Sequence, residues 1–165
     1  MDLLKYRQDA IRNLKSNKVY SIAVTNLPTI FHHNKITIPE SKYIKHALGY
    51  HPELVQEYPD LLPVFKKELK RTRYIGEIGI DGSSRNRESV ELQEKIFSSI
   101  VSLCNEVGGK ILTVHCRQAE KKTLNILGNN FNGKVILHWY SGNISNLEIA
   151  IKKGYWFSIN PSMLK

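Results

Sequence analysis

Short apolar runs alternate with longer amphipathic stretches along most of the chain. Runs typical of buried strands cover residues 19–25, 46–50, 74–80, 110–116, 134–140 and 155–159. Between them, apolar residues recur at helical spacing, most clearly over 88–107, where Gly108-Gly109 marks the helix end. Further helices are predicted over 2–16, from Pro52 to about residue 72, over 118–128 and over 144–153. Pro28 and Pro39 interrupt any long helix over 26–45.

Strands that alternate with helices are typical of a parallel sheet within one α/β domain, here expected to span 1–165. Two architectures fit this pattern: an open doubly wound sheet and a (β/α)₈ barrel. The phosphate-binding patterns GxGxxG and GxxxxGK[ST], which would favour the doubly wound sheet, do not occur in the sequence.

Three of the apolar runs carry a polar residue at or near their carboxyl ends: Glu77, His115 and His138. In a parallel barrel these strand ends converge on one face, where active sites are built. Two imidazoles and a carboxylate on that face would suit a divalent metal ion. A strand-end histidine is also commonly a hydrogen-bonded structural residue, and Glu77 could pair with a neighbouring strand. The residues alone leave both interpretations open.

The chain of 165 residues is basic, with 24 Lys and Arg against 15 Asp and Glu, and its net charge is +9. Such a surplus favours a polyanionic partner such as nucleic acid. An ordinary enzyme with a solvated basic surface would show the same balance. The run "KKELKRTR" over 66–73 is expected to be the exposed end of a helix, where cations also complement the helix dipole.

The sequence predicts a cytoplasmic protein without membrane association. Apolar runs fall short of the ~20 residues that a membrane span requires, and the first twenty residues are too polar for a signal peptide. Cys104 and Cys116 match no zinc-binding spacing and are expected to be reduced thiols.

Several motifs occur in a characteristic order: "ALGYHPEL", "YIGEIGID", Gln93 with Phe97, "TVHCRQAEKKTLNIL", "VILHWYSG" and "GYWFSI". Together they resemble the TatD family of metal-dependent deoxyribonucleases over essentially the whole chain. Within that family, "HWYSG" and "GYWFSINPSML" are most similar to the TatD-like subunit of the Qat anti-phage defence system. The resemblance implies DNA as substrate and partner proteins of a defence complex.

The resemblance also implies a TIM-like (β/α) barrel with up to two divalent metal ions, Mg, Mn or Zn, at the strand carboxyl ends. Glu77 matches the carboxylate shared between the metals and is the expected catalytic residue. His115 and His138 match ligands of one metal. Such sites hydrolyse phosphodiesters because one ion activates water while both stabilise the charge that develops on the phosphate.

Three further residues are expected on the substrate side of this pocket. Arg117, from the H-x-R step, would face a substrate phosphate, and His51 would line the same pocket. Asp81 closes the GEIGID motif and would orient the metal ligands. Core packing is expected for the aromatic residues Trp139, Tyr140 and Trp156, with base stacking as the alternative.

Two parts of the family pattern have no counterpart among these residues: an opening strand that ends in H-x-H and a final strand with a metal-binding Asp. His32-His33 lacks the intervening residue and is expected on a loop or helix surface. The chain therefore resembles strands two to seven of eight, an incomplete barrel. A fragment of a longer protein is the favoured explanation, with a misassigned reading frame or a barrel-completing partner as alternatives.

The missing ligands predict impaired DNA hydrolysis by these residues. Two other functions stay open. The chain could be a non-catalytic nucleic-acid-binding or partner subunit with a degenerate site, or the same barrel chemistry could act on another phosphoester or an amide.

Overall fold

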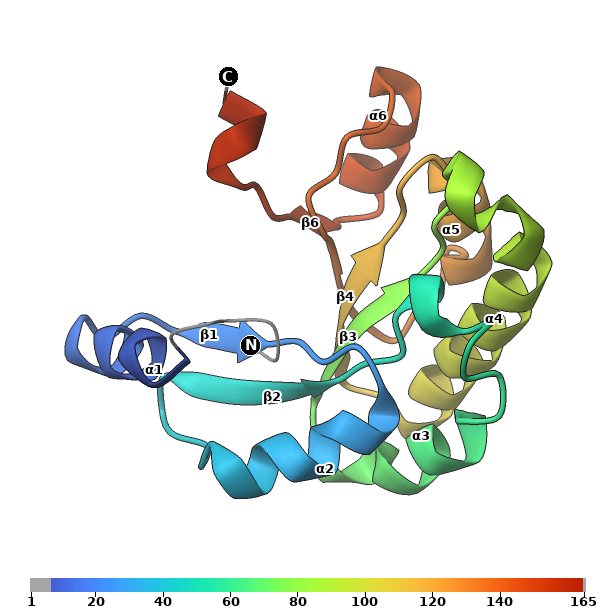
Figure 1. Ribbon diagram of the computed structural model, residues 1–165. Coiled ribbons are helices and arrows are strands. Elements are labelled where there is room, and N and C mark those ends of the chain that lie inside the picture. The colour runs from blue at the N-terminus through green and yellow to red at the C-terminus, as the bar shows by residue number, and fades with distance from the viewer. Residues whose placement is uncertain (1–6, 165) are drawn as a thin grey trace.

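A computed structural model describes residues 7–164, which contain a single six-stranded sheet (Figure 1). The strands are β1 (Ser21–Ala23), β2 (Ile44–Leu48), β3 (Tyr74–Gly79), β4 (Lys110–His115), β5 (Gly133–Leu137) and β6 (Trp156–Phe157). The α-helices are α1 (Arg7–Ser16), α2 (Pro28–Thr37), α3 (Leu62–Glu68), α4 (Val90–Val107), α5 (Glu120–Leu127) and α6 (Ile144–Lys152). Short 3₁₀ helices are η1 (Pro52–Leu54), η2 (Leu69–Arg71), η3 (Ser84–Ser89) and η4 (Pro161–Leu164).

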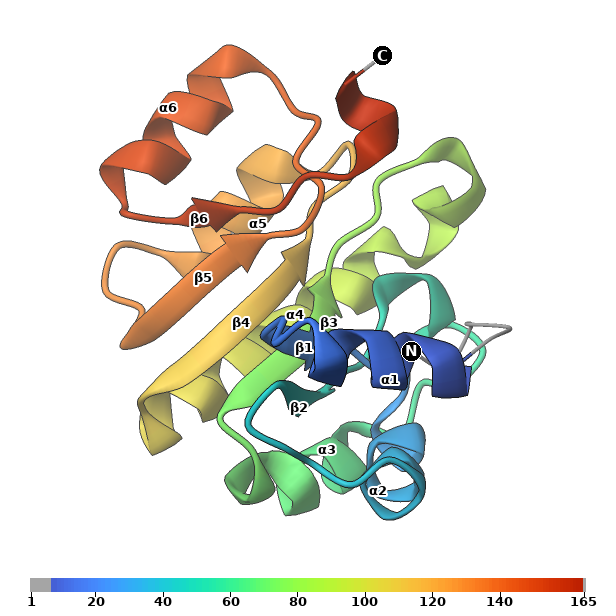
Figure 2. The same cartoon turned by 90° about the vertical axis from the view of Figure 1, so that its left-hand side faces the viewer.

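The strands lie side by side in chain order from β1 to β6, and every neighbouring pair is parallel. A doubly wound sheet would reverse its strand order at a switch point, so this sheet is of the barrel type. Figures 1 and 2 show it curling, with β1 and β2 turned away from β4 and β6 and with α3, α4 and α5 on the outer side. The prediction of an incomplete TIM-like α/β barrel is confirmed.

The main hydrophobic core fills the space between the curled sheet and its covering helices. Strand residues such as Ile75, Ile78 and Leu112 are fully buried against Phe65 and Phe97 from the helices. Strands of a parallel sheet are covered on both faces, which explains their near-continuous apolar runs. β3 is the clearest case, since every residue after Tyr74 is buried. This rigid central strand carries Glu77 to the site.

The observed strands are shorter than the predicted ones at the two ends of the sheet. β1 excludes Val19 and Tyr20, which are 46% and 68% exposed, and β6 is reduced to two residues. Within the described part of the chain, β1 and β6 each pair with one neighbour, so fewer ladder bonds hold them. β2 begins two residues earlier than predicted and ends at Leu48, and His51, three residues further along the chain, lines the site.

Helix boundaries agree more closely with the sequence pattern, except from Pro52 to residue 72, where the predicted helical region is divided into η1, α3 and η2 with a turn between η1 and α3. α4 ends at Val107 and is followed by Gly108 at a φ of 71°, as the glycine pair predicts. Val107 itself is 41% exposed, so the apolar face of this helix ends one turn earlier than predicted. α2 was missed: it begins at Pro28, where proline is tolerated in the first turn, and it ends before Pro39.

His32 and His33 are exposed on α2, as expected. Residues 2–6 of the first predicted helix lie outside the described residues, and α1 covers the rest. Over residues 7–164, none of the helices combines the length and the apolar character that crossing a membrane would demand.

Candidate metal centre

The polar strand-end residues meet at one cavity on the carboxyl side of the sheet. Glu77 lies on β3, His115 is the last residue of β4, and His138 follows β5 directly. These three, together with His51 and Arg117, line a cavity of about 770 Å³. The shared cavity follows from parallel pairing, because Gly79 is in register with His115 and Val114 with Leu137.

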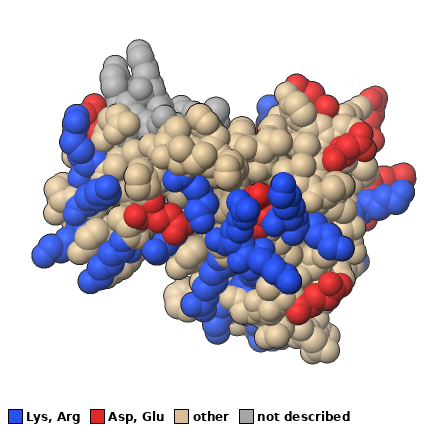
Figure 3. Space-filling view, turned by 90° about the horizontal axis from the view of Figure 1, so that it is seen from below, with Lys and Arg blue, Asp and Glu red and all other residues tan. Residues whose placement is uncertain are grey.

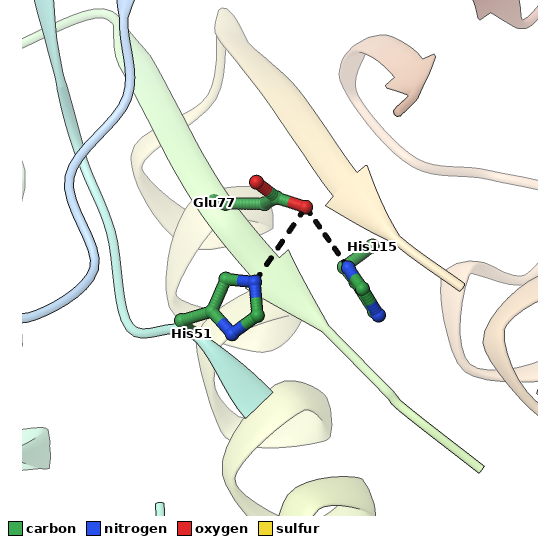
Figure 4. A group of neighbouring side chains, drawn as sticks. All are labelled: His51, Glu77 and His115. Atoms are coloured by element: carbon green, nitrogen blue, oxygen red, sulfur yellow. Dashed lines mark hydrogen bonds and ion pairs between the residues drawn. The ribbon is translucent and has the colours of Figure 1, made fainter. Parts of the chain in front are cut away.

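Glu77 is the centre of the group. It is 8% exposed, and its Oε1 lies 3.0 Å from His115 Nδ1 and 3.7 Å from His51 Nε2 (Figure 4). One ligand atom from each of these three residues lies within 4.8 Å of the others. Ligand atoms around one Zn²⁺ ion stand about 3.4 Å apart at bond lengths near 2.1 Å, so a small contraction of the group would enclose a cation. The nitrogen and oxygen donors fit a divalent metal ion.

Asp81 holds His115 from the other side. Its Oδ2 lies 2.8 Å from His115 Nε2, while its Oδ1 accepts hydrogen bonds from the backbone N–H and the hydroxyl of Ser83. The backbone N–H of Asp81 donates to Gln93 Oε1 at 2.7 Å, and Gln93 is fully buried. A carboxylate behind a histidine orients the ring that faces a metal ion. Asp81 is fully buried and thus reaches the cavity through His115, which agrees with an orienting role.

The charge states at the site follow from these contacts. Burial alone would raise the pKa of Glu77, but the hydrogen bond from His115 and the nearby histidines lower it, so the carboxyl is ionised. Burial would likewise raise the pKa of Asp81, yet hydrogen bonds from Ser83, Asn86 and His115 hold it well below its usual range. Two ionised carboxylates then outweigh the effect of burial on His115 and raise the pKa of its imidazole.

His115 therefore faces a carboxylate with each ring nitrogen, an arrangement that stabilises the doubly protonated ring. A cation placed beside Glu77 would replace the proton on Nδ1, while the Nε2 proton would stay in its bond to Asp81. Burial lowers the pKa values of His51 and His138, which favours their neutral forms.

His51 has a second contact that limits its role. Its Nδ1 accepts a hydrogen bond from the backbone N–H of Glu53 at 3.3 Å, which caps η1. In that tautomer the proton of the neutral ring is on Nε2, which faces Glu77. His51 is then a hydrogen-bond donor in the cavity wall, in keeping with its expected place in the pocket. A protonated Nε2 does not bind a metal ion, even though His51 belongs to the three-residue group.

His138 lies on the same cavity but outside that three-residue group. Its backbone N–H donates to Val114 O at 2.8 Å, and its ring packs 4.7 Å from that of Trp139. When its ring is protonated, the positive charge lowers the pKa of the Glu77 carboxyl. The ligand set of Glu77, His115 and His138 stays a prediction, and so do the roles of His51, Arg117 and Asp81.

Cross-strand bonds that the sequence did not signal fix the backbone at Glu77. The Glu77 N–H donates to Thr25 O at 3.1 Å, and the Thr25 N–H donates to Gly76 O at 3.0 Å. The Thr25 hydroxyl donates to Ala47 O and accepts from the Gly49 N–H. A Cβ on Gly49 would lie 1.6 Å from Thr25 O, so this close approach requires glycine. Thr25 is fully buried and so positions the acidic residue through its neighbours.

The cavity rim is cationic and aromatic. Arg117 is exposed on the rim, and Arg85 joins it, paired with Glu53. Arg85, on η3, was not anticipated, because the segment after the GEIGID motif carries no pattern beyond its basic residues. The expectation of core packing was wrong for Trp139 and Trp156, which are 52% and 64% exposed. Both tryptophans lie at the β6 side of the sheet, where the described residues provide no further strand to cover them.

Comparison with known proteins supports a common origin with DNases. The putative deoxyribonuclease TATDN3 of Mus musculus is 32% identical over 137 residues, which cover 74% of this chain and 46% of that protein. Deoxyribonuclease TATDN3 of Homo sapiens is 31% identical over 139 residues, covering 74% of this chain and 50% of that protein. The chain thus spans about half the length of these relatives.

The crystal structure of YJJV, a TatD homologue from Escherichia coli, shares the fold. It superposes with a TM-score of 0.78 at 18% identity, covering 94% of this chain and 63% of that chain. The family model described as TatD related DNase matches residues 1–165. Since that match spans the whole sequence, this chain belongs to the TatD-related DNase family.

Proposed function

We propose that the chain carries part of a metal-dependent nuclease site that hydrolyses phosphodiester bonds in DNA. The observation that carries this proposal is the arrangement Glu77–His115–Asp81, in which a buried carboxylate orients a histidine toward an ionised glutamate in a cavity. Glu77 and His115 would hold the cation, with His138, directly after β5, reaching it after a change of rotamer. Mg, Mn or Zn would suit these donors, with up to two ions in a complete site.

A bound divalent ion would supply an activated water and would stabilise negative charge on the phosphate. The residues of this chain have other tasks. Arg117 and Arg85 place guanidinium groups on the cavity rim, where their N–H donors match phosphate oxygens. His51 would offer its Nε2–H as a hydrogen-bond donor from the cavity wall. Trp139 presents an exposed ring beside His138, a surface on which a nucleobase can stack.

The printed names of the mouse and human relatives support DNA as the substrate. The similarity of "HWYSG" and "GYWFSINPSML" to the TatD-like subunit of the Qat system supports anti-phage defence as the setting. In that setting the protein would act in the cytoplasm with partner proteins of a defence complex. Coexpression with candidate partners and a phage-plating assay would test this part of the proposal.

Cleavage of labelled DNA with and without divalent metal tests the nuclease proposal. The 165 residues contain no H-x-H motif, so slow hydrolysis that depends on added Mn²⁺ and stops with EDTA is the expected result. Cleavage that continues in EDTA would contradict a metal-dependent mechanism. Robust cleavage would contradict the expected impairment. Metal-independent DNA binding with no hydrolysis at any metal concentration would instead support the non-catalytic binding subunit.

Metal affinity should fall as the pH is lowered, because the cation competes with a proton for His115 Nδ1. Below the raised pKa of His115 each ion must displace that proton, so the affinity should drop about tenfold per pH unit. Above that pKa the affinity should level off. Isothermal titration of Mn²⁺ across pH 5.5–8.5 would measure this.

The variant Asp81→Asn provides the control for this pH dependence. It removes a charge that raises the pKa of His115, so the decline in affinity should move to lower pH. If the Mn²⁺ affinity of the parent protein did not change with pH, His115 would be excluded as a ligand.

A further inference from the structure

A second concave surface lies at the amino ends of β3 and β4, on the side of the sheet away from the metal centre. Four cations line it: Lys70, Arg71, Arg73 and Lys110, which we call the basic face. They surround a depression of about 310 Å³ together with Thr72, Gly108 and Gly109. Figure 3, seen from below, shows Lys and Arg side chains gathered there. β4 runs from Lys110 to His115, so about 17 Å separates this surface from the metal centre.

The fold uses one of these cations and leaves the others exposed. Lys110 is buried, and its Nζ donates to Leu69 O and Thr72 O, each at 2.7 Å. These carbonyls end the α3–η2 segment, so Lys110 already complements the negative end of that helix. Lys70 and Arg73 are exposed and are not needed for the same task. Simple neutralisation of a helix end therefore does not explain the whole group.

Local contacts hold the basic face in a defined geometry. The Arg73 Nε–H donates to Gly109 O at 3.2 Å, which uses one of the five donors of the guanidinium group. Arg71 pairs with Glu68 at 3.3 Å, and the Lys35 ammonium donates to Arg71 O, adding a cation at the border. Positive charge thus exceeds negative charge on the basic face, and local contacts hold its arginine side chains in place before any ligand binds.

We propose that the basic face binds the phosphate backbone of nucleic acid, at a site separate from the metal centre. Guanidinium groups match phosphate oxygens in pairs, and the exposed side chains of Lys70 and Arg73 both line the depression. The choice of nucleic acid among polyanions rests on the proposed function. DNA that binds to the basic face stays near the protein when it leaves the cavity of the metal centre. This second contact raises the local concentration of DNA at that cavity.

Fluorescence anisotropy with a fluorescein-labelled DNA duplex in EDTA tests this without any contribution from a metal ion. The double variant Lys70→Glu/Arg73→Glu should weaken binding about tenfold or more. It should also reduce the slope of log affinity against log salt by about 2, since each phosphate contact contributes about 0.9. The matched control Lys95→Glu/Lys152→Glu changes the same charge at exposed positions on α4 and α6 and should bind nearly as the parent does. Circular dichroism confirms that each variant is folded.

Equal losses in the two double variants would overturn the proposal, because they would show diffuse attraction by net charge. Unchanged binding by Lys70→Glu/Arg73→Glu would also overturn it. Vesicles of phosphatidylserine and phosphatidylcholine serve as a competing polyanion. If the vesicles bind the parent protein more tightly than DNA does, and if Lys70→Glu/Arg73→Glu abolishes that binding, the basic face is a membrane contact instead. A failed nuclease assay leaves this result unaffected, because binding is measured without metal or cleavage.

Discussion

Replacing Glu77 by Gln is expected to weaken binding of Mn²⁺ at least about 100-fold. Glu77 is the one carboxylate of the group that also contains His51 and His115, and it is 8% exposed. An amide keeps the shape but removes the negative charge that a divalent cation requires. Loss of a residue that merely supports a ligand costs 10–100-fold in metal affinity, so loss of a ligand should cost more. Isothermal titration at pH 8 provides the measurement.

Glu53→Gln is the matched control for this variant. Glu53 lines the same cavity but pairs with Arg85, outside the three-residue group. Its replacement should change Mn²⁺ affinity by less than about threefold, since no ligand is lost. Unaltered affinity in Glu77→Gln, or equal losses in both variants, would show that the cation does not bind at Glu77. A DNA cleavage assay on the same proteins should follow the metal affinities.

Replacing Gly79 by Ala is expected to destabilise the protein by about 3 kcal/mol or more, from overpacking and backbone strain together. Gly79 pairs with His115 in the sheet at a φ of 136°, and a Cβ there would lie 2.0 Å from His115 O. Backbone atoms cannot yield as a flexible side chain can, so β3 and β4 must separate at the site. Thermal unfolding should show a decrease in Tm of about 6–12 °C.

Gly109→Ala separates the two causes of that loss. Gly109 has a φ of 65°, and nothing lies within 4 Å of a Cβ built there. This variant should lose only the conformational cost of a left-handed residue, about 1–2 kcal/mol. If both variants lost the same stability, the close approach of Gly79 to His115 would not be the cause.

Sequence reasoning was most accurate for side chains whose position depends only on the strand that carries them. Glu77, His115 and His138 were predicted at strand ends from their position in apolar runs, and all three line one cavity. Strand and helix periodicities predicted a parallel α/β sheet, and the resemblance of the motifs to the TatD family implied the TIM-like barrel. The same reasoning failed for Trp139, since an aromatic residue in an apolar run is buried only if a neighbouring element covers it.

Contacts between distant segments had no signature in the sequence. Thr25 fixes the backbone of Glu77 through a hydrogen bond across strands, and Gly49 matters because Thr25 O lies against it. Arg85 reaches the rim from η3, a segment whose composition alone does not distinguish it from other basic segments. The basic face likewise joins the end of η2 with the start of β4, which lie 38 residues apart at Thr72 and Lys110.

The sequence by itself determined the succession of the six strands, most of the helices and the family, and it supplied the residues predicted to bind a cation, because periodicity and residue chemistry are local properties. Tertiary structure decided how those residues combine. It placed His51 beside Glu77, set Asp81 behind His115 and left His138 at the border of the group. These relations depend on the curl of the sheet and on the register of its strands, and both arise from packing between segments far apart in the chain.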